Sequence, residues 1–214
     1  MKIAFYDTET SGLPIRTYEY GRLHITQPYI VQMAWFVYDT ESKKHQFYEE
    51  YIKVNESVNL SEGSINIHGI TTEMLKDKGK HIIDVLNTFR YSTKDCDMYI
   101  AHNVAFDKPL ILKECERNDI SFVFNSAAQH YCTMKSNIER CGIVKTYKGK
   151  ESFKYPKLLE LHEKIFPQDH NSLVVAKLHN ALHDVVLTAR CYMFTQMSLD
   201  LRNIHPELFH NLYQ

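Results

Sequence analysis

The amino-acid sequence predicts an α/β domain with a mixed five-stranded sheet flanked by helices. Three segments rich in apolar, β-branched and aromatic residues follow one another within the first 54 residues, which indicates three antiparallel N-terminal strands. After residue 71, short apolar segments alternate with segments whose apolar residues recur at helical spacing. Strands first, and then strands alternating with helices, are typical of a mixed sheet covered by helices.

The individual elements follow from the same patterns. Strands are predicted at residues 2–7, 29–38, 45–54, 98–101 and 128–132. Helices are predicted around 72–75, at 81–91, from the end of the fourth strand to about 118, and at 133–140, 157–165 and 181–197. Pro109 is expected in the first turn of its helix, where its missing N–H costs little. Residues 13–28, which follow Gly12, are expected to be irregular.

Length and composition limit the class of protein. The chain has 214 residues, 44% hydrophobic and 24% charged, with a formal net charge of −1. These values fit one domain with a real core and exclude a disordered chain. They also argue against binding of nucleic acid through a broad basic surface. We therefore expect a single domain over 1–214, with a core at about 2–197 and an extension at 198–214 that packs on the domain or on a partner.

The sequence also carries expectations about location. No apolar run approaches the ~18–20 residues of a membrane span, and an acidic residue comes too early for a signal peptide. The five cysteines are scattered and form no Cys-x-x-Cys pair, which fits reduced thiols. We expect an intracellular protein, cytoplasmic and without membrane contact.

Asp7 and Glu9 form the sharpest local feature. They lie at the end of the first predicted strand, where residues two apart point to the same face. Two adjacent carboxylates are unfavourable unless something neutralises them, and a divalent cation with oxygen ligands does so. A solvated acidic pair in a turn is the alternative. The apolar strand before the pair and Gly12 after it favour the cation site.

Two further acids stand at the starts of predicted helices. Asp107 closes the segment 102–107, and Asp184 closes the segment 179–184. Both follow a histidine by five positions. In a chain with twelve histidines this spacing arises by chance, so spacing alone decides nothing. The order of the segments and their context must decide.

Taken together, these segments resemble the DEDDh branch of the DnaQ-like 3′–5′ exonucleases, a family with an RNase H-like fold. The matches are Asp-x-Glu-Thr-small-Gly-Leu at 7–13, His-Gly-Ile-Thr at 68–71, His-Asn-x-x-Phe-Asp at 102–107, Lys-Leu-x-x-Leu within 156–166 and His-x-Ala-x-x-Asp at 179–184. They run in order over about residues 2–195. The tyrosine-type branch would carry Tyr where this chain has Asn180, which favours the histidine branch.

The resemblance implies a metal-dependent exonuclease that hydrolyses phosphodiester bonds at the 3′ end of single-stranded DNA or RNA and releases nucleoside 5′-monophosphates. Two divalent cations, Mg²⁺ with Mn²⁺ able to substitute, would serve a two-metal mechanism. Asp7 would bridge both ions, Glu9 and Asp184 would complete the site that activates water, and Asp107 would hold the second ion. His179 would be the general base.

The resemblance also implies contacts with the substrate. The residues near the terminal nucleotide would be Thr8, Thr10, Leu13, Ile67, His68, Asn103 and Phe106. For Leu13 and Ile67, a place in the core is an equal alternative. A basic and aromatic run could contact the strand away from the cut site, and its members are Lys145, Tyr147, Lys148, Lys150 and Lys154. A solvated loop is the alternative for this run.

Other functions stay open at this stage. One is a non-catalytic or partner-dependent nucleic-acid-binding or scaffold subunit that keeps the exonuclease fold. Another is a purely structural divalent site. A protein partner or a homodimer is compatible with the sequence, and nothing in it distinguishes DNA from RNA.

Overall fold

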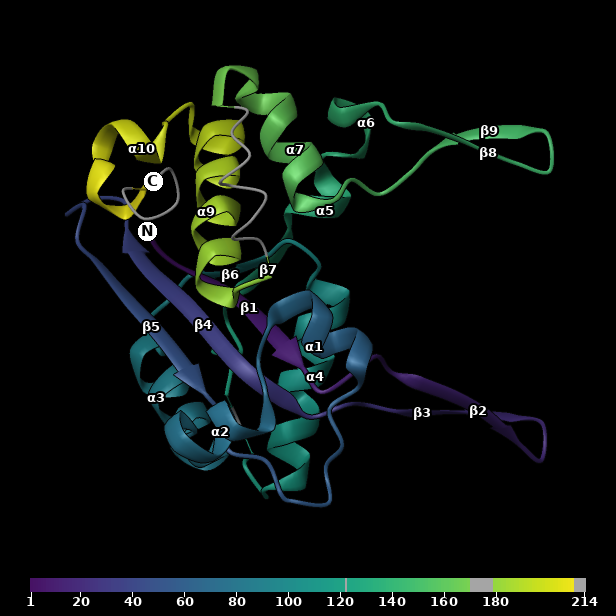
Figure 1. Ribbon diagram of the computed structural model, residues 1–214. Helices are drawn as coiled ribbons and strands as arrows, with labels where there is room; N and C mark the ends of the chain where they lie inside the picture. The colour runs from purple at the N-terminus through teal and green to yellow at the C-terminus, as the bar shows by residue number, and fades with distance from the viewer. Residues whose placement is uncertain (122, 170–178, 210–214) are drawn as a thin grey trace.

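The computed structural model describes residues 1–121, 123–169 and 179–209 (Figure 1). Its strands are β1 (Lys2–Thr10), β2 (Ile15–Glu19), β3 (Arg22–Thr26), β4 (Ile30–Asp39), β5 (His45–Tyr51), β6 (Met98–Ala101), β7 (Gln129–Cys132), β8 (Val144–Tyr147) and β9 (Lys150–Phe153). Its α-helices are α1 (Glu62–His68), α2 (Thr72–Lys78), α3 (Ile82–Thr93), α4 (Val104–Arg117), α5 (Thr133–Ser136), α6 (Ile138–Cys141), α7 (Leu158–Ile165), α9 (Ala181–Met197) and α10 (Leu201–Ile204). Two 3₁₀ turns follow α7 and α10, η1 (Pro167–Asp169) and η2 (Pro206–Phe209).

The central sheet has five strands in the order β5-β4-β1-β6-β7. β1, β4 and β5 are antiparallel neighbours, whereas β6 and β7 run parallel to β1. This confirms the predicted mixed sheet with three antiparallel N-terminal strands. β1 is at the centre and extends three residues beyond its predicted end, to Thr10.

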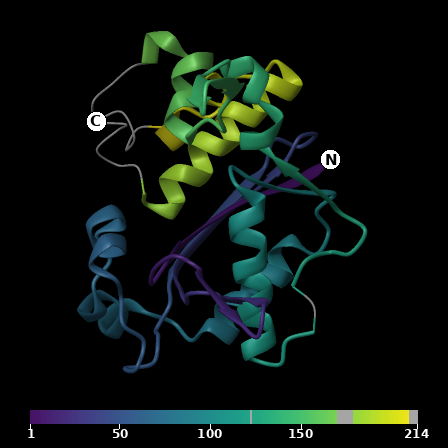
Figure 2. The same ribbon diagram turned by 90° about the vertical axis from the view of Figure 1, so that its right-hand side faces the viewer.

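Helices cover both faces of the sheet (Figure 2). Ile3 and Phe5 of β1 belong to a buried cluster that includes the apolar residues of α9. Ala4 and Tyr6 belong to a second cluster with the apolar residues of α3 and α4. Because successive side chains of a strand point to opposite faces, the odd-numbered residues of β1 face α9. The alternation continues to the end of the strand and decides where its acids point.

The last described segment, 198–209, packs on α9. Leu201 and Phe209 are buried in the same cluster as the apolar face of α9. Arg190, which is 1% exposed, forms an ion pair with Asp200 at 2.7 Å and another with Asp169 at 2.6 Å. A buried arginine needs such partners, since an unpaired charge there would be very unfavourable.

Two hairpins, β2–β3 and β8–β9, project from the same side of the molecule (Figure 1). All their strand residues are exposed. The expectation that 13–28 is irregular was therefore wrong, and 144–153 forms a hairpin instead of a loop. Both turns have two residues at positive φ, Tyr20-Gly21 and Lys148-Gly149. This is the backbone of the tight turns that match the strand twist.

The remaining elements agree only in part with the predicted ones. The helix predicted at 133–140 is two short helices, α5 and α6, the strand predicted at 45–54 ends at Tyr51, and α10 was not predicted. Thr71 caps α2 by accepting from the Met74 N–H at 3.3 Å, as its sequence predicts. α1, however, was not predicted, and Pro109 lies at the sixth position of α4 and not in its first turn. The reason is that α4 already begins at Val104, directly after Asn103. Among the described residues, no helix is long and apolar enough to cross a membrane.

Candidate active site

Four acidic side chains come from three different elements. Asp7 and Glu9 are on the face of β1 that carries Ile3 and Phe5, toward α9. Asp184 lies in the first turn of α9, and Asp107 lies in the first turn of α4, which directly follows β6. Since β1 and β6 are parallel neighbours, their carboxyl ends meet at one edge of the sheet. Strand pairing therefore brings acids a hundred residues apart to one place.

The electrostatics show that the four carboxyl groups interact. Burial, and then the charges of Asp107, Asp184 and Glu9, hold the pKa of Asp7 well above its usual range. Burial followed by the charges of Asp184 and Asp107 raises the pKa of Glu9 to about 8. Burial also raises the pKa of Asp107 to about 7 and that of Asp184 to about 7, although hydrogen bonds oppose both shifts. Such clusters of raised carboxyl pKa values are typical of functional sites.

Thr8 fixes the orientation of Asp107. Its backbone N–H donates to Asp107 Oδ1 at 3.1 Å, and its hydroxyl donates to the same oxygen at 2.9 Å. Asp107 is only 2% exposed. The two bonds engage both polar donors of Thr8, so in this structure neither is left for a substrate.

The donor set fits a divalent cation. All four acids offer oxygen ligands, and their mutual repulsion is the kind that a hard cation relieves. Oδ1 of Asp184 is buried and has no hydrogen-bond partner among the described residues. One ligand atom each from Glu9, His179 and Asp184 lies within 4.8 Å of the others. A buried carboxylate oxygen without a donor is costly, and a metal ion would compensate it.

His179 stands beside these acids. Its φ is 66°, in the left-handed region that a residue other than glycine seldom adopts. Partial burial and, to a smaller extent, Lys157 lower its pKa below the usual value. The imidazole is therefore neutral near pH 7 and able to accept a proton.

His102 has the same spacing to an acid but a different environment. Its Nδ1 lies 3.0 Å from Thr133 Oγ1, and its Nε2 lies 3.0 Å from the carbonyl oxygen of Pro156. Burial lowers its pKa to about 4. One neutral tautomer satisfies both contacts, with Nε2–H donating to Pro156 and Nδ1 accepting from Thr133. The ring thus ties the end of β6 to the segment before α7.

A polar network that the sequence analysis missed holds the start of α9. Gln32 of β4, fully buried, accepts from the Ala181 N–H at 3.2 Å and donates to Glu49 at 2.8 Å. Asn180 donates to the same Glu49 oxygen at 3.2 Å, and its own side-chain oxygen caps the helix. The sequence contains a signal for this network, because Gln32 is the lone polar residue in the apolar stretch from Ile30 to Val37.

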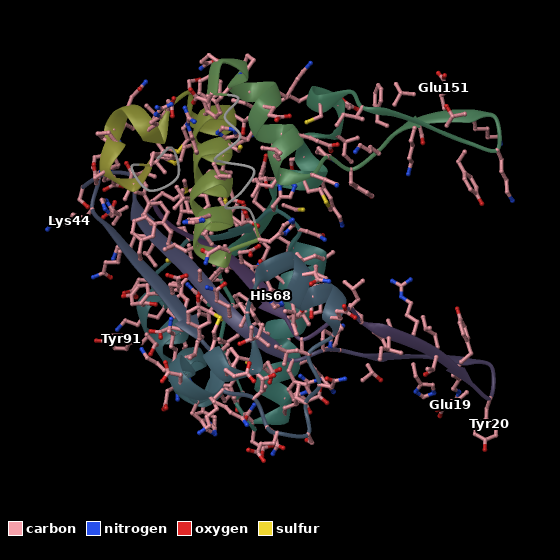
Figure 3. All side chains as sticks on the ribbon, viewed as in Figure 1. Glu19, Tyr20, Lys44, His68, Tyr91 and Glu151 are labelled. Carbon is pink, nitrogen blue, oxygen red and sulfur yellow. The ribbon has the colours of Figure 1, made fainter. Side chains whose placement is uncertain are left out.

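α1 covers the segment after β1. Ser64 donates to the carbonyl oxygen of Ser11 at 3.1 Å. The Ile70 N–H donates to His68 Nδ1 at 3.0 Å, so Nε2 carries the proton and donates to the Thr10 carbonyl at 3.1 Å. Figure 3 shows His68 on the body of the domain, whereas Tyr20 and Glu151 lie far out on the two projecting hairpins. His68 therefore has no free ring nitrogen in this structure.

The other residues predicted near the substrate differ in exposure. Leu13 is 79% exposed and Ile67 is 56% exposed, so neither belongs to the core. Phe106 and Asn103 are half-buried at the start of α4, and the Asn103 side chain makes no capping bond there. Exposed apolar side chains beside an acidic site are available to pack on a ligand.

The basic and aromatic run lies mainly on the β8–β9 hairpin. Lys145, Tyr147, Lys148 and Lys150 are exposed there. Lys154 lies beyond the hairpin and forms an ion pair with Glu160 at 2.5 Å. The structure therefore separates Lys154 from the other three lysines of the run.

Comparisons with known proteins find similarity to exonucleases. The family model RNase_T, described as exonuclease, matches residues 4–192. Among solved structures, Escherichia coli exonuclease I with a dA16 oligonucleotide has a TM-score of 0.61 at 17% identity, covering 97% of this chain and 42% of that one. The zinc-bound complex of the same enzyme with single-stranded DNA gives a TM-score of 0.62 at 17% identity, with the same coverage.

A related enzyme from another bacterium gives a similar result. Exonuclease I from Methylocaldum szegediense has a TM-score of 0.60 at 16% identity, covering 96% of this chain and 43% of that one. This chain thus spans less than half the length of these proteins, and the likeness concerns the fold. No curated protein sequence matches the chain. Since the family model covers most of its length, the chain belongs to the RNase_T exonuclease family, within the DnaQ-like branch of the RNase H-like superfamily.

Proposed function

We propose that this protein is a metal-dependent 3′–5′ exonuclease that removes nucleoside 5′-monophosphates from single-stranded nucleic acid. The observation that carries the proposal is the convergence of Asp7, Glu9, Asp107 and Asp184 beside His179 in a chain of the exonuclease family. Each of these residues stands at the matching position of a DEDDh motif.

The four acids are proposed to hold two divalent cations. Mg²⁺ suits them best, because it prefers a few carboxylates plus water and phosphate oxygens, and Mn²⁺ should substitute. When bound, two such ions neutralise the scissile phosphate and stabilise both the attacking and the leaving oxygen. Asp7 would help to hold both ions, Glu9 and Asp184 would hold one of them, and Asp107 would hold the other.

His179 is proposed to move the proton. A neutral imidazole next to Glu9 and Asp184 can take a proton from the attacking water, and the resulting cation is stabilised by the carboxylates around it. The lowered pKa keeps the ring in its basic form near neutral pH. His102 is a poor candidate for this role because both of its ring nitrogens are occupied.

The strand end is proposed to lie between α1 and the start of α4. Leu13, Ile67, His68 and Phe106 would pack on the terminal nucleotide, while Asn103 and the backbone at Thr10 would contact its sugar. Thr8 would act instead by holding Asp107, because both of its donors are engaged there. Stacking on apolar and aromatic groups tolerates any base, which an exonuclease requires. Because solved relatives hold oligodeoxynucleotides, single-stranded DNA is the substrate to test first.

The β8–β9 hairpin is proposed to contact the strand farther from its end. Three exposed lysines and Tyr147 offer phosphate contacts and a stacking surface on one ribbon. The β2–β3 hairpin carries exposed Tyr18 and Tyr20 beside Arg16 and Arg22 on the same side of the molecule. A strand leaving the acidic site would pass these two ribbons.

A digestion assay tests the proposal. Single-stranded and duplex DNA and RNA, labelled separately at the 5′ and the 3′ end, are incubated with the isolated chain and Mg²⁺. We expect immediate release of a labelled mononucleotide from the 3′ end and progressive shortening of the 5′-labelled strand. Release from the 5′ end first would overturn the proposed polarity.

The same assay distinguishes the alternatives. A non-catalytic or partner-dependent subunit would bind the strand, measured by a gel shift, without cleaving it alone. A purely structural metal site would be stabilised by Ca²⁺ and show no turnover with any divalent ion. Cleavage by the isolated chain would also support the proposal that residues 1–214 form one self-sufficient exonuclease domain.

A further inference from the structure

Three possible metal ligands lie at the end of the sheet opposite the acidic site. His45 begins β5, His205 caps the C-terminus of α10, and Glu207 belongs to η2. His45 pairs with Tyr38, near the start of β1, whereas the catalytic candidates lie at the end of that strand. One ligand atom from each of the three residues lies within 4.8 Å of the other two.

The two histidine rings are already in contact. Their centroids are 4.5 Å apart at an angle of 78°, and the ring of Tyr38 packs against that of His205 at 5.8 Å. The backbone of Lys43 also lies beside the His45 ring.

His205 has one satisfied nitrogen and one unsatisfied nitrogen. Nδ1 lies 3.0 Å from Glu207 Oε1. Nε2 is buried and has no hydrogen-bond partner among the described residues. Nδ1 and Glu207 Oε1, which are already in contact, can serve as ligands of one shared ion, whereas Nε2 lies on the other side of the ring and would carry its proton.

We propose that His45, His205 and Glu207 bind one divalent transition-metal ion, with Zn²⁺ the best match. Two imidazoles and a carboxylate are a common protein contribution to a zinc site, with water completing the tetrahedron. Mg²⁺ is disfavoured because it prefers oxygen ligands. This site therefore differs from the acidic site in the chemistry of its ion as well as in its place.

The surroundings allow an ion and its water ligand to reach the site. His45 and His205 line a surface cavity of about 520 Å³. The lysines that also line it, Lys2, Lys43 and Lys44, are offset by Asp39 and Asp95 of the same wall and by the ligand Glu207. The bound ion would join the edge strand β5 to the segment after α10, two parts of the chain 160 residues apart.

The test uses the full chain with the acidic site disabled by Asp7→Asn and Asp184→Asn, which leaves His45, His205 and Glu207 as the intact group of three possible ligands among the described residues. Calorimetric titration in excess Mg²⁺ should give one equivalent of bound Zn²⁺. Adding His45→Ala or His205→Ala should abolish this binding, and Glu207→Gln should weaken it about tenfold or more. His24→Ala on exposed β3 is the matched control and should leave it unchanged.

Further measurements test the geometry of the bound ion and its effect on stability. Co²⁺ in place of Zn²⁺ should give the strong visible absorption of a tetrahedral site, and Zn²⁺ should raise the Tm reversibly by mass action. Because Glu207 is 59% exposed, Glu207→Gln should not disturb folding, which circular dichroism checks. The proposal is overturned if the disabled chain binds no Zn²⁺, or if the His45 and His205 variants bind it as tightly.

Discussion

Asp7, Glu9, Asp107 and Asp184 are unfavourable neighbours at the scale of single residues. Burial raises the pKa of all four carboxyl groups, and the charges of neighbouring acids raise those of Asp7, Glu9 and Asp184 further, so without a cation the site destabilises the fold at neutral pH. A residue that costs stability and remains in the chain is best explained by function. Removing one acid should therefore lower the activity and raise the stability of the metal-free protein.

Asp7→Asn tests this contrast. We expect Mg²⁺-dependent cleavage to fall by at least about 10²–10³-fold, since one stabilising group of the transition state is lost. The Tm of the metal-free protein should rise at pH 8, by roughly 2–4 °C for each kcal/mol of repulsion removed. Asp77→Asn, an exposed change on α2, is the control for both measurements. Substantial activity in the Asp7 variant would count against the proposed site.

His179→Ala and His102→Ala separate a base from a positioning residue. The His179→Ala variant should lower the rate about 10²–10⁴-fold. It should also remove the acidic limb of the pH–rate profile. In the unaltered protein we expect this limb below the usual histidine pKa, because the pKa of His179 is lowered. The second should lower the Tm, because it breaks the contacts with Thr133 and Pro156. An unchanged pH profile in the first variant would remove His179 as the base.

At the scale of elements, the two hairpins stand apart from the rest. An isolated two-stranded hairpin is at best marginally stable, and every strand residue of β2, β3, β8 and β9 is exposed. Neither ribbon contributes to the buried clusters. Their turns are well specified nevertheless, which favours a role in contacting something outside the domain.

Changing Lys145, Lys148 and Lys150 together to alanine tests the β8–β9 ribbon. We expect weaker binding of long single strands and a salt dependence whose slope decreases by about 0.7 for each phosphate that the ribbon no longer neutralises. Cleavage of a dinucleotide should stay unchanged, because it does not reach the ribbon. Lys53, Lys76 and Lys78, exposed elsewhere, provide a matched triple variant. Equal salt slopes for the two variants would remove the ribbon from the binding surface.

At the scale of the whole molecule, the parts that bury apolar residues were predictable from the sequence. β4 and α9 are evident in it because tertiary packing demands apolar residues at regular spacing. α1 and the hairpins bury little or nothing, so no periodicity marks them. The convergence of the acids depends on strand pairing between distant segments, which composition and spacing do not reveal. The resemblance to the family motifs predicted this convergence instead.

The pH dependence of stability is also a property of the whole molecule. In the unfolded chain the four acids ionise near pH 4, whereas the folded pKa values of Asp107 and Asp184 are about 7 and that of Glu9 is about 8. The four acids of the folded state thus hold more protons between these limits, so their contribution to the free energy of unfolding falls as pH rises from about 4 to 8. Buried His102, His130 and His162, whose pKa values are lowered to about 4, oppose this fall at low pH, so the net fall of the metal-free protein is expected above ~6.5, where unfolded histidines are neutral as well. Urea unfolding with EDTA checks this.

A divalent cation should reverse this trend. Mg²⁺ binds the ionised acids, so its stabilising effect should grow over the same pH range and should be absent at pH 4. The Asp7→Asn variant provides the control, since it should show a shallower fall without metal and a smaller effect of Mg²⁺. A metal-free stability that increases between about pH 6.5 and 8, where the unfolded histidines are neutral, would contradict the raised pKa values.

The pleat of β1 determines how insertions and deletions in this strand would affect the site. The side chains of Ile3 and Phe5 hold the strand against α9. Those of Asp7 and Glu9, two and four residues after Phe5, point to the same face of the sheet. Loss of a single codon between Phe5 and Asp7 would either rotate the acids to the wrong side or pull the anchors out of the core. Insertion of two residues there would keep both sets on their present side and only move the acids along the strand. A change of one residue in this part of β1 should therefore be more damaging than a change of two.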